Sequence, residues 1–199
     1  HTFKRNKKFY KEEKKKNIKC LVGIDYFPFK KEKNRYLKRD KILVNFGGVF
    51  DKNLINKSLK ILNKISLQKN IIIISRYYSK KFIPKNCKNL DVKIVKQRDQ
   101  LNDIYKKTFL SFGSCGISIY EKLFYKVPSI CTSVARNQFN NYRNFSKFKF
   151  IIKLKEAQIL ESTELLKNIK TLKKRLKKFG KFVDKKKIYD IIKLYETKY

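Results

Sequence analysis

The sequence predicts an α/β fold, in which a Rossmann-like parallel sheet carries helices on both faces. Short apolar runs such as ILVNF and NIIIIS are typical of strands that are buried on both faces. Between such runs lie segments of about ten residues whose apolar positions recur at helical spacing. Strands that alternate with helices of this length form parallel sheets. Apolar residues make up 42% of the 199-residue chain, which is enough for a packed core.

The elements can be followed along the chain from Lys41. Strands are predicted at residues 42–46, 70–75, 93–97, 109–112, 128–134 and 149–153. Helices are predicted after Asp51 or Asn53, which can serve as the N-cap, and at residues 99–107, 117–126 and 137–147. Asp99 is the expected cap of the second helix. A helical tail of two or three segments follows from about residue 156, with a break near Gly180.

The chain is expected to divide near Lys41. Residues 1–40 are mostly charged, with one short apolar run, CLVGIDYFPFK. They are predicted to be the tail of a missing N-terminal domain followed by an interdomain linker. The chain contains no methionine and so does not start at a natural start codon, which is why an upstream part is expected. Residues 41–199 are predicted to form the C-terminal domain, including its helical tail.

The formal net charge of +36 raises the question of nucleic-acid binding. Arginine, which suits bidentate contacts to phosphates and bases, is scarce beside lysine, and the lysines are spread along the whole chain. Lys, Asn, Ile, Tyr and Phe all have AT-rich codons, so a biased gene composition explains their abundance together. The charge is therefore interpreted as a solvated lysine coat. Nucleic acid is not expected as a partner, and at most peripheral contact with an anionic membrane would follow from the charge.

Cysteine and histidine usage excludes several kinds of site. Cys20, Cys87, Cys115 and Cys131 lie far apart, without a Cys-x-x-Cys pair, so neither a disulfide framework nor a metal site is expected. Free thiols favour a cytoplasmic location, and no run approaches the ~18 apolar residues of a membrane span. The single histidine, His1, leaves no room for a Ser-His-Asp or Cys-His arrangement. No cofactor is expected either.

The stretch FLSFGSCGISIYEKL contains the candidate site. A turn, Gly113-Ser114-Cys115-Gly116, follows a strand and opens a helix, where free backbone N–H groups can face an anion. Alone, this Gly-x-x-Gly pattern fits an ordinary tight turn equally well, and it is neither a dinucleotide fingerprint nor a P-loop. Glu121 lies five residues past Gly116, several ångströms into the helix at ~1.5 Å per residue. That is about the separation of pyrophosphate and ribose in a nucleotide, although a solvent-facing glutamate is the alternative.

Several segments together resemble a known family. The stretch SFGSCGISIYEKLFYKVPSI resembles the Gly-Gly-Ser-x-x-x-Glu-x-x-x-x-x-x-Pro signature in the C-terminal domain of GT-B nucleotide-sugar enzymes. The segment KILVNFGGVFDKNL is similar to the strand and double glycine that begin this domain, and SVARNQFNNY to its Asn-Gln element. CLVGIDYFPFKKE resembles the segment that joins the two domains. The likeness covers most of residues 20–150 and is strongest to the UDP-sugar hydrolases of pseudaminic acid biosynthesis. The family 28 glycosyltransferases that build peptidoglycan lipid intermediates are also similar.

The resemblance implies a role for each matched residue. The backbone of Gly113, Ser114, Cys115, Gly116 and Ile117 would hold the pyrophosphate, and Glu121 the ribose hydroxyls. Arg98 falls where family members bind uracil through the main chain, Asn137 and Gln138 would face the sugar or phosphate, and Gly47 and Gly48 would let the first loop approach the ligand. Asn137 and Gln138 would otherwise be read as a polar helix cap.

Some positions depart from the family pattern. Cys115 stands where a glycine is usual, Ile117 where a serine is common, and Val49 and Phe50 replace the Ser-Asp that often follows the double glycine. A hydroxyl lost at Ile117 would weaken phosphate binding. Cys115 has no histidine partner and is interpreted as a small packed residue, not as a nucleophile.

The resemblance implies that the full protein is a UDP-sugar hydrolase in the biosynthesis of pseudaminic acid, a nonulosonic acid. The catalytic residues, including the family's water-activating histidine, are expected upstream, so this chain would bind UDP without hydrolysing a UDP-sugar. One alternative is a GT-B glycosyltransferase that passes the sugar of a UDP-sugar to an acceptor. A basic nucleic-acid-binding protein is the third hypothesis. The sequence leaves the sugar and the oligomeric state open.

Overall fold

The computed structural model describes residues 38–48, 50–67, 69–96 and 101–179. Within them lies a six-stranded sheet in the order β3-β2-β1-β4-β5-β6, with every neighbouring pair parallel. The strands are Lys41–Asn45 (β1), Asn70–Ile74 (β2), Val92–Val95 (β3), Thr108–Ser114 (β4), Ser129–Thr132 (β5) and Ile152–Lys153 (β6). The sheet and the helices around it confirm the predicted Rossmann-like α/β fold.

Six α-helices accompany the sheet in the described part of the chain. They are Lys52–Lys64 (α2), Asn102–Lys107 (α3), Ser118–Phe124 (α4), Phe139–Lys147 (α5), Leu154–Ile159 (α6) and Ser162–Phe179 (α7). Short 3₁₀ turns span Lys80–Phe82 (η2), Lys85–Cys87 (η3) and Arg136–Gln138 (η4). The side chain of Asp51 caps α2 by accepting from the backbone N–H of Leu54 at 3.0 Å, so Asp51 and not Asn53 is the cap.

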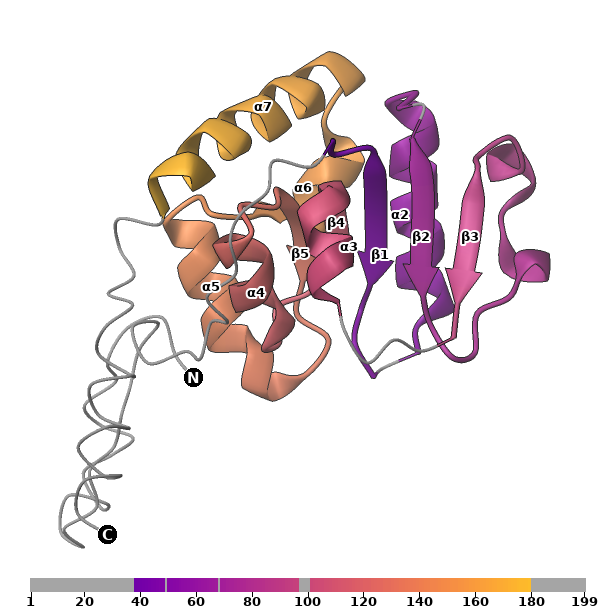
Figure 1. Ribbon diagram of the computed structural model, residues 1–199, viewed down its shortest axis with the longest axis horizontal. Coiled ribbons are helices and arrows are strands. Elements are labelled where there is room, and N and C mark those ends of the chain that lie inside the picture. The colour runs from indigo at the N-terminus through magenta and orange to yellow at the C-terminus, as the bar shows by residue number, and fades with distance from the viewer. Residues whose placement is uncertain (1–37, 49, 68, 97–100, 180–199) are drawn as a thin grey trace, which may run out of the picture.

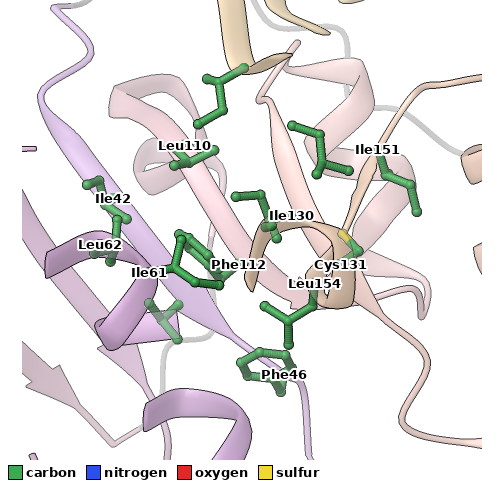
Figure 2. Close-up of a cluster of buried hydrophobic side chains, with 14 of the residues drawn as sticks. Ile42, Phe46, Ile61, Leu62, Leu110, Phe112, Ile130, Cys131, Ile151 and Leu154 are labelled. Atoms are coloured by element: carbon green, nitrogen blue, oxygen red, sulfur yellow. The ribbon is translucent and has the colours of Figure 1, made fainter. Parts of the chain in front are cut away.

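Two groups of buried side chains hold the sheet and helices together. The larger group includes Ile42, Phe112 and Ile130 of neighbouring strands and Leu62 of α2, which Figure 2 shows gathered in one cluster. A smaller group joins Leu43 and Ile72 to Ile104 and Tyr105 of α3. Helices therefore bury apolar side chains against both faces of the sheet. This is the arrangement that stabilises an all-parallel sheet, because its central strands are buried on both faces.

Several predicted boundaries were wrong. The strand predicted to end at Phe112 continues to Ser114, because Gly113 pairs with Asn45 of β1 and Cys131 of β5 and so extends the ladder on both sides. The turn therefore starts at Cys115 rather than at Gly113. The helix predicted to reach Lys126 ends at Phe124, since Lys126 adopts a positive φ of 56° that a right-handed helix does not allow.

Smaller differences concern the other ends. The helix predicted at 99–107 begins at Asn102, and its expected cap Asp99 lies outside the described residues. The segment 137–147 opens as a 3₁₀ turn and becomes α-helical only at Phe139, while the last strand is reduced to Ile152–Lys153. The helical tail starts at Leu154, and Gly180 lies outside the described residues.

The strand order creates one special place in the sheet. From β1 the chain adds β2 and β3 on one side, then crosses over and adds β4, β5 and β6 on the other. The carboxyl ends of β1 and β4 therefore lie side by side, while the connections that follow them run in opposite directions. In Figure 1 the arrowheads of β1, β2 and β3 all point to the same edge. In open α/β sheets, ligands bind beyond this edge at such a switch point.

Candidate functional site

The loop after β1 is shaped by a local hydrogen bond. The side-chain Oδ1 of Asn45 accepts from the backbone N–H of Gly47 at 2.8 Å, and Gly47 has a φ of +82°. Residues with a side chain rarely adopt this conformation, which explains the glycine. A Cβ placed on Gly47 would lie 3.7 Å from Oγ of Ser114, so the loop packs directly against the end of β4. Gly48 has open space around it.

The turn after β4 leaves three consecutive backbone donors free. The N–H of Cys115 donates to the carbonyl of Thr132 at 3.1 Å and so continues the sheet. The N–H groups of Gly116, Ile117 and Ser118 donate to no acceptor among the residues that the structure describes. Successive unpaired N–H groups form a concave binding surface for an anion. Since α4 has only seven residues, these N–H groups matter more here than the helix dipole does.

Gln138 reaches this turn from the next connection. Its Oε1 accepts from the backbone N–H of Val134 at 3.2 Å, and this bond fixes the orientation of the amide. A Cβ on Gly116 would lie 3.4 Å from Nε2 of Gln138 and 3.8 Å from Oγ of Ser114. Gly47, Ser114, Gly116 and Gln138 are therefore neighbours in space, although nearly a hundred residues separate the first from the last.

The other predicted site residues are placed as follows. Asn137 is exposed, immediately before Gln138, and Ile117 is exposed on the turn. Gly113 is a buried strand residue: a Cβ there would lie 2.3 Å from the carbonyl oxygen of Asn45, so only glycine fits. Arg98 lies outside the described residues, as does Val49.

Glu121 is held by a residue that the sequence did not single out. It lies in the first turn of α4 and is half-buried, and its Oε2 accepts from the hydroxyl of Tyr105 at 3.1 Å. Tyr105 is fully buried on α3, the helix that precedes β4. Burial, together with the charge of Glu121 and the hydrogen bond to it, raises the pKa of Tyr105, so the phenol stays protonated and remains the donor. The carboxylate thus has a fixed orientation, unlike that of a freely solvated surface glutamate.

Cys115 packs in the core behind the turn. Its side chain is fully buried, and both the hydrogen bond with Cys131 and burial raise the pKa of its thiol. A buried, protonated thiol is a poor nucleophile. The structure therefore agrees with the interpretation of Cys115 as a small packed residue.

Asn141 of α5 supports the same turn and was also missed from the sequence. Its Nδ2 donates to the backbone carbonyl of Cys115 at 3.3 Å, and its Oδ1 accepts from the hydroxyl of Tyr120 at 2.8 Å. It is one of few buried polar residues in the described domain. The one signal in the sequence is that an asparagine occupies the apolar face of a predicted helix.

Replacing Asn141 with alanine is expected to lower the free energy of unfolding by about 1–3 kcal/mol, because it removes two buried hydrogen bonds, one to the carbonyl of Cys115 and one to the hydroxyl of Tyr120. Its neighbour Asn140 is exposed, and Asn140→Ala is the matched control, expected to change stability by less than about 0.5 kcal/mol. Urea unfolding of the two variants measures the difference. Equal midpoints would show that the Asn141 side chain does not support the turn.

The edge that carries these residues is also apolar. Of the five large hydrophobic side chains that are exposed in the described part of the chain, four follow the carboxyl ends of strands. They are Phe50, Tyr77, Ile117 and Phe139. The rings of Phe50 and Tyr77 meet edge to face, with centroids 5.8 Å apart. Exposed apolar side chains that gather at one edge are typical of a surface that meets a ligand or another domain.

A hollow of about 720 Å³ lies between α5, α6 and α7, and Phe139 contributes to its lining. Its lining includes Arg143, Lys147 and Arg175, but none of the residues that the sequence assigned to the site. Among the described residues, no group of three or more His, Cys, Asp or Glu side chains is arranged to hold a metal ion. No helix in the described ranges has the length and apolar character that a membrane crossing requires.

Comparisons with known proteins place the fold. No family model and no curated protein matches the sequence. Among solved structures, the chain is similar to Phytolacca americana UGT2 complexed with UDP-2fluoro-glucose and pterostilbene, with 16% identity and a TM-score of 0.58. It is also similar to a Polygonum tinctorium UDP-glucosyltransferase that glucosylates indoxyl, with 16% identity and a TM-score of 0.51. Each match covers 81% of this chain and 42% of the other, so the chain spans less than half of those enzymes. The described domain therefore shares its fold with part of GT-B type UDP-glycosyltransferases.

Proposed function

We propose that this chain binds the UDP part of a UDP-sugar and belongs to a GT-B glycosyltransferase. One observation carries the proposal. At the switch point of the sheet, four residues lie close together beside three free N–H groups: Gly47, Ser114, Gly116 and Gln138. The family resemblance of the sequence assigns nucleotide contacts to the same four residues. The fold that the chain shares with UDP-glycosyltransferases supports the same proposal.

Each part of the nucleotide has a counterpart in the proposed site. The N–H groups of Gly116, Ile117 and Ser118 donate to the pyrophosphate, with the hydroxyl of Ser114 beside them. The carboxylate of Glu121 accepts from the ribose hydroxyls, in the orientation that Tyr105 sets. Gln138 offers its Nε2 to the phosphate or to the sugar. Uracil would lie near the end of β3, where Arg98 follows in the sequence.

The chemistry that this site contributes is stabilisation of the leaving group. When the bond between the sugar carbon and the phosphate oxygen breaks, negative charge develops on the departing UDP. Backbone donors that are already oriented toward that oxygen stabilise the charge without reorganising. Activation of the acceptor and most recognition of the sugar are assigned to residues outside this domain.

Transfer to an acceptor is preferred over hydrolysis, because the solved structures that share the fold are transferases. The UDP-sugar hydrolase of pseudaminic acid biosynthesis remains the second candidate, and its support is the sequence resemblance alone. In both cases this chain would bind UDP and leave a UDP-sugar intact. Release of UDP from a UDP-sugar by this chain alone would contradict that division of labour.

Calorimetric titration of the chain with UDP tests the proposal, with a single-stranded oligonucleotide as competitor. We expect saturable UDP binding that moderate salt leaves largely intact. A nucleic-acid-binding protein would instead bind the oligonucleotide tightly and with a steep dependence on salt. No binding heat at millimolar UDP would overturn the proposal.

Tyr105→Phe is expected to reduce UDP affinity by about three- to tenfold. The variant loses the hydrogen bond that holds the carboxylate of Glu121 in the orientation that ribose binding requires. If Tyr105 positions Glu121, the Tyr105→Phe variant should also show a smaller preference for UDP over 2′-deoxy-UDP, measured by calorimetry. Tyr142→Phe on α5 is the matched control, because Tyr142 is half-exposed and lies in the lining of the α5–α7 hollow. An unchanged preference would mean that Tyr105 serves packing alone.

A further inference from the structure

Lys122 of α4 is buried in an unusual way. Its side chain is fully buried, and its Nζ has no hydrogen-bond partner within the described ranges. The amine lies over the end of β4, where a Cβ on Gly113 would come within 2.6 Å of Nζ. The glycine at position 113 therefore provides the space for the amine. Because Gly113 pairs with Asn45 and Cys131, the amine lies at the carboxyl ends of the central strands.

This placement is unfavourable for the domain by itself. A buried ammonium that has no hydrogen-bond partner loses its hydration, and this loss is unfavourable. Burial accordingly lowers the pKa of Lys122. The titratable groups that face it are Cys131 of β5, Cys115 of the turn and Glu121 of its own helix, and all three favour the charged form. Glu121 is engaged by Tyr105, and none of the three forms a hydrogen bond with the amine. An apolar residue of similar length would therefore stabilise the ligand-free domain.

The position of the amine suggests what it serves. Gly113, which it covers, directly precedes Ser114 and the turn with the free N–H groups. Nζ therefore lies beside the strand position that comes three residues before the first of these N–H groups, on Gly116. Charges that are separated by protein rather than water interact strongly over several ångströms, so direct contact is not required.

We propose that Lys122 is an internal counter-charge for the diphosphate of UDP, and that its amine takes up a proton from solvent when UDP binds at the turn of Cys115 to Ser118. This inference rests on the proposed function. In the free protein, burial favours the neutral amine. In the complex, the nearby phosphates stabilise the ammonium, and the proton that converts –NH₂ to –NH₃⁺ comes from the buffer.

The proposal fixes the direction of the pH dependence. Binding favours the protonated amine, so UDP affinity is highest at low pH and falls as the pH rises through the pKa of the amine in the complex. The phosphate of UDP itself titrates near pH 6, so the useful range runs from about pH 7 to about pH 9. Uridine carries no phosphate, and its binding is expected to take up no proton.

Calorimetric titrations with UDP at about pH 8, in buffers of low and high ionisation enthalpy, count the protons taken up on binding. Wild type is expected to show uptake. Lys122→Met is expected to show none and to bind UDP about tenfold more weakly, as loss of a nearby charge implies. Lys170→Met is the matched control, since Lys170 is exposed on α7, and it should behave as wild type. An absence of proton uptake by wild type overturns the proposal even if the methionine variant fails to fold.

Stability provides a second, ligand-free readout. Lys122→Met is expected to unfold at a higher temperature than wild type. The unfolded lysine titrates at its ordinary pKa of 10.5, above its lowered value in the folded chain. Between the two values the unfolded state binds more protons, so wild-type stability rises with pH and the advantage of the variant shrinks.

The outcomes separate the two proposals. UDP binding by wild type without proton uptake, or with uptake that persists in Lys122→Met, overturns the role of Lys122 and leaves the UDP site standing. An absence of UDP binding by wild type overturns both. Proton uptake that disappears in Lys122→Met and remains in Lys170→Met supports the internal counter-charge.

Discussion

Replacing Glu121 with alanine is expected to weaken UDP binding by about 1–3 kcal/mol, which corresponds to about a five- to 150-fold rise in Kd. The carboxylate is the only acidic group in the first turn of α4, and the hydroxyl of Tyr105 orients it at 3.1 Å. In the proposed complex it accepts from the ribose hydroxyls. Removing it leaves those hydroxyls without a protein acceptor, and the hydroxyl of Tyr105 loses its acceptor as well.

The measurement is a calorimetric titration of wild type and variant with UDP and with 2′-deoxy-UDP. Loss of the carboxylate should reduce the preference for the ribonucleotide as well as the affinity. Glu164→Ala is the matched control, because Glu164 also lies in the first turn of a helix, α7, and is exposed. It should bind UDP as wild type does. Equal affinities for Glu121→Ala and Glu164→Ala would remove Glu121 from the site.

Gly113→Ala is expected to have the largest effect on stability, lowering the free energy of unfolding by about 3 kcal/mol. A methyl group at this position would lie 2.3 Å from the carbonyl oxygen of Asn45 and 2.6 Å from Nζ of Lys122. The lysine end can move, but the carbonyl belongs to the backbone of β1 and is held in the sheet. Relief would require β1 and β4 to separate at the switch point.

Gly48→Ala is the control for this prediction. No atom lies within 4 Å of a Cβ at Gly48, and its backbone needs no left-handed conformation. The Gly48→Ala variant should therefore be as stable as wild type or slightly more stable. Urea unfolding at equilibrium gives both values. If Gly113→Ala were as stable as Gly48→Ala, the close packing of β1, β4 and Lys122 would be wrong.

The sequence predicted the central strands well because they are short, mainly apolar runs buried on both faces, as in Ile71, Ile72 and Ile73 of β2. It placed Gly47 and Gly116 at one edge of the sheet, since connections that leave parallel strands share an edge. The sequence did not predict the order of the strands in the sheet. Which strands become neighbours depends on packing between distant segments, and local spacing does not report that packing.

The site was predicted where backbone geometry dominates and missed where side chains interact at a distance. Gly113 was assigned to the turn because two glycines in a short stretch suggest one, whereas here the first glycine makes room for Lys122. The contacts of Tyr105 with Glu121 and of Asn141 with Cys115 join separate elements. No pattern along the chain pairs these residues, so only the folded arrangement identifies them.

The central claim is that UDP binds at the carboxyl ends of β1 and β4. Backbone amide NMR spectra of the ¹⁵N-labelled chain, recorded during titration with UDP, test it most directly because each amide reports its own position. If UDP binds there, the signals of Gly47, Gly116 and Ile117 shift in a saturable way, while those of Ser146 and Thr171 in the α5–α7 hollow stay in place. Shifts confined to the hollow, or no shifts at millimolar UDP, would contradict it.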